Sequence, residues 1–127
     1  MLARAGMVGV ELVFGLRAVE SRVPYHLSGG EKRKVALASV LALNPEVLCL
    51  DEPMGGLDPR TKSSLRALIA TLNAAGKTII CATHDFEYVE GLFRRAVALS
   101  REGRLVRDGP YDEIMGDRDF LEAMNII

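Results

Sequence analysis

Two adjacent carboxylates and one histidine are the side chains of this chain whose positions could support chemistry. Asp51 and Glu52 follow the apolar run 47–50, which is typical of a buried strand covered on both faces. His84 follows a second apolar run at 78–82. The carboxyl end of a buried strand is where ligands bind in open α/β sheets. Two carboxylates there are costly unless a cation or a proton accompanies them, so the pair indicates a site that handles one or the other.

A turn of small residues, Leu27-Ser28-Gly29-Gly30-Glu31, is the third segment that could carry chemistry. Ser28 and Glu31 fit a capping box that opens a helix. Capping accounts for these two residues, but it does not account for two glycines in the first turn, where they weaken the helix. Glycines let the backbone approach a ligand closely, and the start of a helix favours anions. The segment therefore predicts either a phosphate contact or an ordinary capped helix.

A phosphate-binding P-loop is not found in these 127 residues. That motif needs G-x-x-x-x-G-K-[ST] between a strand and a helix. The one Gly-Lys-Thr sequence is at 76–78, and the position of its partner glycine holds Thr71. The segment also runs from a helix into a strand, so Gly76 is better interpreted as the residue that ends the helix.

Taken in chain order, the segment 27–31, the strand that ends in Asp51 and Glu52, and His84 resemble three motifs of the ATP-binding cassette (ABC) ATPases. They resemble, respectively, the signature motif, the Walker B strand with its catalytic glutamate, and the switch histidine. The resemblance covers nearly the whole chain but only the C-terminal part of the family's domain. It implies an α/β fold: the C-terminal part of a P-loop NTPase (RecA-like) domain, with a mainly parallel sheet, flanking helices and a piece of the helical subdomain. Residues 1–44 would be the partial helical subdomain, and residues 45–127 the C-terminal part of the core.

The resemblance also implies roles for individual residues. Asp51 would support Mg²⁺, Glu52 would position or deprotonate the attacking water, and His84 would contact the terminal phosphate. The residues that would contact the nucleotide held by a second subunit are Leu27, Ser28, Gly29, Gly30, Glu31 and Asp58. Glu31 stands where many members of the family have Gln. Asp58 matches the D-loop, although helix capping accounts for it on local grounds.

The cofactors implied by the resemblance are ATP and Mg²⁺, and the implied partners are a second ABC ATPase subunit in a head-to-tail dimer and a transmembrane subunit. Softer signals at 24–26, 55–59 and 108–110 resemble the energy-coupling ATPases of cobalt, nickel and vitamin importers. The implied location is the cytoplasmic side of the cell membrane. The Leu-Ser-Gly-Gly-Glu-Lys sequence is also similar to chromosome-maintenance and DNA-repair ATPases, but Pro53 and the lack of a preceding heptad arm disfavour them.

Two functions stay open at this point. The chain is either part of an ATP-hydrolysing transporter subunit, or a non-catalytic or remnant module that lends only its signature motif to an intact ATPase. Without a P-loop, the 127 residues alone are expected to bind ATP poorly and to be inactive.

Composition sets further limits. An apolar content of 49% suits one domain with a buried sheet, and a net charge of −1 gives no case for a nucleic-acid surface. The basic run 32–34 is expected to be a solvated helix face, and Cys49 and Cys81 are expected to be buried, reduced thiols. The expected elements are a short helix and loop in 1–16, helices over about 28–44, 58–75 and 85–93 (the last capped by Asp85), strands at 47–50 and 78–82, a hairpin of 96–99 with 104–106, a turn at 108–110, and two short C-terminal helices.

Overall fold

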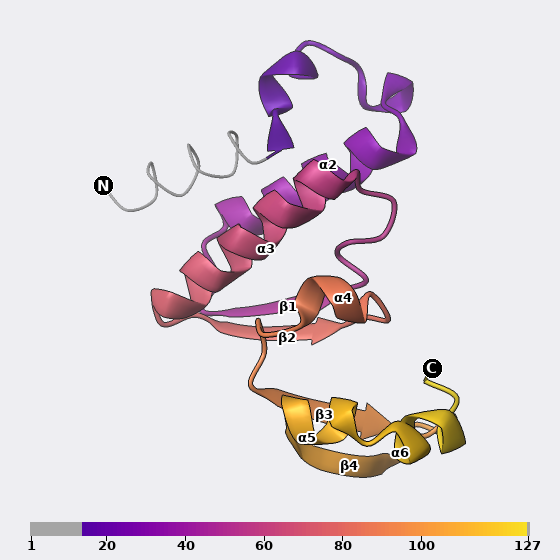
Figure 1. Cartoon of the computed structure of the whole chain (residues 1–127). Coiled ribbons are helices and arrows are strands. Elements are labelled where there is room, and N and C mark those ends of the chain that lie inside the picture. Colours follow the sequence, from indigo (N-terminus) through magenta and orange to yellow (C-terminus); the bar gives the residue numbers. More distant parts are fainter. Residues whose placement is uncertain (1–13, 127) are drawn as a thin grey trace. The chain divides into compact units, whose positions relative to one another are not determined.

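The structure of the chain is a computed structural model that describes residues 14–126. These residues form two compact units, one ending at Tyr88 and the other beginning at Val89, and each is described by itself (Figure 1). The short helix and loop expected in 1–16 lie mostly outside the described residues. Within residues 14–126, no helix has both the length and the apolar character needed to cross a membrane.

The first long helix, α2 (Gly29–Ala42), begins with the predicted capping box. The Ser28 hydroxyl accepts from the N–H of Glu31 at 3.2 Å, and the Glu31 carboxylate accepts from the N–H of Ser28 at 2.8 Å. Two short 3-10 turns, η1 (Leu16–Ala18) and η2 (Pro24–His26), precede the helix. The helix ends before Asn44, whose left-handed φ of 50° breaks the helical path, and Pro45 follows.

The first two strands, β1 (Val47–Asp51) and β2 (Thr78–Ala82), pair in parallel, with Cys49 opposite Ile80. Leu48 and Leu50 of β1 are buried, but the residues that alternate with them are exposed. The prediction of a strand covered on both faces is therefore wrong for this pair, because the described helices pack against one face. The prediction of a buried Cys49 fails for the same reason: its side chain is on the uncovered face.

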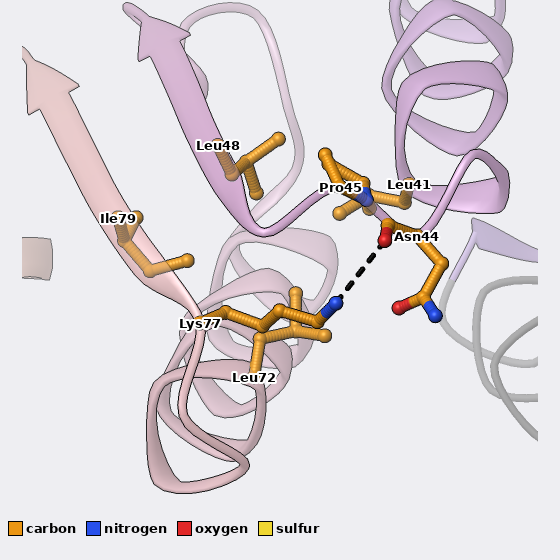
Figure 2. Close-up of a pocket in the computed structure, with 7 residues that line it drawn as sticks. All are labelled: Leu41, Asn44, Pro45, Leu48, Leu72, Lys77 and Ile79. Carbon is orange, nitrogen blue, oxygen red and sulfur yellow. Dashed lines mark hydrogen bonds between the residues drawn. The ribbon is translucent and has the colours of Figure 1, made fainter. Parts of the chain in front are cut away.

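The covered face of the sheet meets both long helices. Leu48 and Ile79 from the strands line a cavity of about 10 Å³ together with Leu41 of α2 and Leu72 of α3 (Figure 2). Lys77 crosses the mouth of this cavity and donates to the carbonyl of Asn44 at 3.1 Å. The cavity has room for about one water molecule, so it is a packing feature of the core rather than a ligand site.

Helix α3 (Pro59–Ala74) starts and stops where the sequence predicts. Asp58 caps it by accepting from the N–H of Thr61 at 2.9 Å, and Pro59 occupies the first helical position. Gly76 ends it with a φ of 91°. Its buried residues include Leu65 and Ile69, which are spaced four apart and hold the helix against the core.

The next helix, α4 (Phe86–Val89), is shorter than predicted, and Asp85 does not cap it with its side chain. The helix stops at Val89 because Gly91 has a left-handed φ of 67°. The carboxylate of Asp85 instead binds Lys62 of α3 at 2.7 Å. The cap prediction is therefore wrong, because the Asp85 carboxylate contacts α3 and the N–H of Tyr88 donates to the backbone carbonyl of Asp85.

The second unit is an antiparallel hairpin with two short helices. Strands β3 (Arg95–Leu99) and β4 (Leu105–Pro110) pair as predicted, and α5 (Tyr111–Gly116) and α6 (Arg118–Ala123) follow. The turn expected at 108–110 is wrong: these residues extend β4, with Gly109 opposite Ala96. The guanidinium of Arg95 binds both carboxylate oxygens of Asp108, at 2.7 and 2.6 Å, which holds this end of the hairpin in register.

Candidate functional site

The backbone of Glu52 is held at the point where β1 leaves the sheet. Its N–H donates to the carbonyl of Ala82 at 2.8 Å, one step beyond the last paired residues of the two strands. Its φ of 46° is in the left-handed region, so the chain turns sharply at this residue. The guanidinium of Arg33 donates to its carbonyl, which also accepts from the N–H of Gly55 at 3.2 Å. The chain direction at Glu52 is thereby fixed from α2 and from the turn that follows β1.

The side chain of Glu52 reaches the segment that follows β2. One carboxylate oxygen accepts from the hydroxyl of Thr83 at 3.1 Å. The other accepts from the N–H of His84 at 3.0 Å and lies 2.7 Å from Nδ1 of the same residue. Two strand ends that are 32 residues apart in the chain are thus joined through one carboxylate. The prediction that Glu52 and His84 belong to one site is consistent with this contact.

Each member of the Glu52–His84 pair shifts the pKa of the other. Desolvation raises the pKa of Glu52, but the hydrogen bonds from His84 and Thr83 outweigh it, so the net pKa is lowered. The hydrogen bond with Glu52 raises the pKa of His84. The His84 side chain is 82% exposed, whereas that of Glu52 is 36% exposed. An ionised carboxylate beside a solvent-facing imidazole can orient a water molecule and accept its proton.

Asp51 is exposed, and its carboxylate makes no hydrogen bond or ion pair within residues 14–126. No group of three or more His, Cys, Asp or Glu in this part of the chain could hold a metal ion. A single free carboxylate nevertheless fits Mg²⁺, which keeps several waters and is often bound by one or two carboxylates together with substrate phosphates. Asp51 would then be the one protein ligand that the described residues supply.

The signature segment is a helix start with exposed polar groups. Leu27 is buried and anchors it, while Ser28 and Gly29 are exposed. The first backbone bond of the helix runs from the N–H of Lys32 to the carbonyl of Ser28, so the earlier N–H groups of Gly29 and Gly30 lack a backbone partner within the described residues. The Glu31 carboxylate is committed to the capping box and to Arg22 at 3.1 Å, and its pKa is lowered chiefly by the backbone hydrogen bond of Ser28. Two unpaired donors are therefore left to bind an anion.

Asp58 uses both carboxylate oxygens locally. They accept from the N–H and the hydroxyl of Thr61, the latter at 2.6 Å, and from Lys34 at 3.3 Å. These bonds, that of the Thr61 hydroxyl first, hold the pKa of Asp58 far below its usual range. Capping thus accounts for this residue, and its place in a nucleotide site stays a prediction. The described residues show no contact of Ser28 or Asp58 with the Glu52–His84 pair.

Two residues of the site were missed by the sequence analysis. Thr83 binds Glu52 directly, and its position next to His84 was the signal that could have found it. Arg33 belongs to the basic run that was expected to be a solvated helix face, and this expectation is wrong for two of its three members. Arg33 is half-buried and binds the Glu52 carbonyl, and Lys34 binds Asp58. No sequence signal separates such residues from solvated lysines and arginines.

The family model and the relatives described below are all ABC transporter proteins. The protein-family model described as ABC transporter matches residues 4–55. A putative ABC transporter ATP-binding protein of Clostridium acetobutylicum is 54% identical over 115 residues, which are 91% of this chain and 48% of that protein. The energy-coupling factor transporter ATP-binding protein EcfA of Methanococcus maripaludis is 40% identical over 111 residues, 87% of this chain and 40% of that protein. The chain thus spans about half the length, or less, of these relatives.

Solved structures agree on the fold. The structure of CbiO1 from Clostridium perfringens, part of the ABC transporter complex CbiONQ, matches with a TM-score of 0.65 at 31% identity, over 97% of this chain and 49% of that one. An ATP-binding cassette of an ABC transporter in its ADP conformation matches with a TM-score of 0.69 at 21% identity, over 96% of this chain and 49% of that one. The second likeness concerns the fold alone.

The fold and the matches define the class of protein: over most of its length the chain is similar to ABC transporter ATP-binding proteins, and its fold is that of the C-terminal part of their P-loop ATPase domain. The predicted fold class is confirmed. Within this class the chain is similar to the ATP-binding proteins of energy-coupling factor transporters and to CbiO1.

Proposed function

We propose that this chain supplies the Walker B, switch and signature residues of an ABC subunit that hydrolyses ATP to energise import through a transmembrane partner. The observation that carries the proposal is the Glu52 carboxylate, held by His84 and Thr83 at the end of the β1–β2 pair. The lowered pKa keeps the half-exposed Glu52 carboxylate ionised, so beside the exposed imidazole it can accept a hydrogen bond from a water molecule and orient it.

The other residues are assigned around this centre. His84 keeps Glu52 oriented, and its exposed ring faces outward, where a terminal phosphate could bind. Asp51 would hold Mg²⁺, which supplies charge stabilisation to the phosphates when bound. The free N–H groups of Gly29 and Gly30, with the Ser28 hydroxyl, would contact the nucleotide of a second ABC subunit in a head-to-tail dimer.

The relatives' names support the energy-coupling type of importer. They include EcfA proteins and the CbiO1 subunit of a CbiONQ complex. We extend this to a cargo of the cobalt, nickel or vitamin class, with the chain at the cytoplasmic face of the membrane beside its transmembrane subunit. Because the chain matches about half of each relative, the activity and partners of those whole proteins are part of the proposal.

The test is to co-express the chain with a P-loop-bearing N-terminal segment of an ABC ATPase and to measure Mg²⁺-dependent phosphate release from ATP. Activity is expected from the purified complex and from neither part alone. A soluble complex with no activity above background would contradict the proposal. The alternative, a module that lends only its signature motif, is tested with an intact ABC ATPase whose own signature serine is replaced by Arg. Restoration of its turnover by this chain, together with an inactive complex, would establish that alternative.

A further inference from the structure

Lys62 on α3 binds the segment that follows His84 through two of its side chains. The ammonium of Lys62 lies 2.7 Å from the carboxylate of Asp85 and 4.4 Å from the ring centre of Tyr88. The side chains of Lys62 and Asp85 are 17% and 26% exposed, whereas that of His84 is 82% exposed. The ion pair next to the histidine is thus better shielded than the histidine, and a shielded ion pair is screened less by salt.

The contacts of Asp85 lead directly to the Glu52 carboxylate. The N–H of Asp85 donates to the hydroxyl of Thr83 at 3.0 Å, and that hydroxyl donates to Glu52 at 3.1 Å. On the other side, the guanidinium of Arg66 donates to the carbonyl of Tyr88 at 2.8 Å. Two basic residues one helical turn apart on α3 therefore hold the two ends of the segment 85–88.

Apart from the bonds of Thr83 and His84 to Glu52, the segment 83–88 has little regular structure to fix its conformation. Residues 83–85 are in neither a helix nor a strand, and α4 has four residues, too few to be stable as an isolated helix. Its order must come from tertiary contacts, and those with α3 are the ion pair, the cation–π contact and the Arg66 hydrogen bond.

We propose that Lys62 is a positioning residue, which holds the segment 83–88 on α3 so that Thr83 and His84 stay on the Glu52 carboxylate. Its effect on turnover rests on the proposed function, whereas its effect on the geometry of His84 does not. Loss of the Lys62 contacts would let the segment move, lengthen the Glu52–His84 contact and misplace the imidazole.

A purely electrostatic role for Lys62 predicts a change of the opposite sign in the pKa of His84 when the lysine is replaced. The charged groups that act on His84 in the described part of the chain are Glu52, Asp85 and Lys62. The hydrogen bond and charge of Glu52 raise the pKa of His84, and the positive charge of Lys62 lowers it. Removing the Lys62 charge without movement would therefore raise the pKa of His84. Removing it with loss of the Glu52 contact would lower that pKa toward its ordinary value.

The experiment is an NMR titration of the His84 ring in the 127-residue chain, with the signal assigned from a His84→Gln variant. Lys62→Met keeps the length of the side chain and removes its charge, and Lys62→Arg restores the charge. Lys77→Met is the matched control, because it also removes one lysine and one hydrogen bond from the same unit but lies at the other end of β2. We expect a lower His84 pKa in Lys62→Met and an unchanged value in Lys62→Arg and Lys77→Met.

A raised or unchanged His84 pKa in Lys62→Met would overturn the proposal, as would an equal decrease in Lys77→Met or in Lys62→Arg. If Lys62→Met does not fold, as judged by circular dichroism, Lys62→Gln is titrated under the same criteria. In the rebuilt ATPase, Lys62→Met should lower kcat about tenfold or more with little change in KM, because misplaced groups slow the chemical step. An inactive parent complex would count against the proposed function and leave the titration result standing on its own.

Discussion

Replacement of Glu52 by Gln can separate the chemistry of this residue from its structural contacts. The variant is made in the complex of this chain with a P-loop-bearing N-terminal segment, called the rebuilt domain. The amide oxygen of Gln can still accept from the N–H and Nδ1 of His84, which now bind one carboxylate oxygen at 3.0 and 2.7 Å. The amide NH₂ would face the Thr83 hydroxyl, which now donates at 3.1 Å and accepts from the N–H of Asp85. A hydroxyl has two acceptor lone pairs, so Thr83 can accept from the new amide as well. The local structure should therefore survive.

The expected loss is that of a positioned base. General-base catalysis contributes roughly 10²- to 10⁴-fold, so phosphate release should fall by this factor. In activation free energy the loss is about 3–5 kcal/mol. ATP binding should be retained because Asp51 is unchanged, and the closed dimer should accumulate when ATP is added.

The assay is phosphate release under saturating Mg-ATP, together with equilibrium nucleotide binding and size-exclusion chromatography. Glu46→Gln is the matched control, because Glu46 is exposed just before β1 and its side chain makes no contact with the described residues of the site. Equal rates for Glu52→Gln and the parent complex would refute the assignment of the base. A loss of ATP binding in Glu52→Gln would refute the division of roles between Glu52 and Asp51.

Three further substitution or labelling experiments follow from the site and the sheet. Asp51→Asn should weaken Mg²⁺-dependent nucleotide binding itself, which calorimetry with and without Mg²⁺ can measure; unchanged affinity in Mg²⁺ would remove Asp51 from the metal site. Ser28→Arg should leave binding to each P-loop intact but prevent ATP-driven dimerisation in sedimentation, because its bulk lies at the helix start that would face the partner's nucleotide. In the folded chain at pH 8, a thiol reagent should modify Cys49 well before Cys81, because Cys49 is exposed while burial raises the pKa of Cys81 to about 11. Equal rates by mass spectrometry would show that the two faces of the sheet are equally accessible.

The sequence predicted those features that depend on signals only a few residues long. The capping box at Ser28 and the cap at Asp58 involve contacts three residues apart, and Gly76 ends α3 through its own backbone freedom. The two parallel strands were found from short apolar runs. Such features depend on neighbours in the sequence, so one sequence is sufficient to find them.

Contacts between distant residues were not predictable in the same way. Asp85 is of a residue type that caps helices, but its carboxylate binds Lys62, which is 23 residues earlier in the chain. The exposure of Cys49 depends on which helices cover the sheet, and an apolar run alone does not report that. The residues at 108–110 have turn composition, yet pairing of Asp108 with Arg95 keeps them in β4. In each case the outcome depended on the tertiary surroundings, which a local pattern does not report.

The left-handed backbone at Glu52 has a consequence for how this position would change under different selections. A residue with a Cβ costs roughly 1–2 kcal/mol in this conformation, and Gly or Asn adopts it more readily. A library varied at position 52 and sorted only for resistance to proteolysis should therefore admit Asn, Gly or Asp beside Glu, because the lower backbone strain offsets the lost bonds to Thr83 and His84, whereas one sorted for ATP turnover should retain Glu. The identity of this residue would then record whether a lineage has been under pressure to hydrolyse nucleotide or merely to fold.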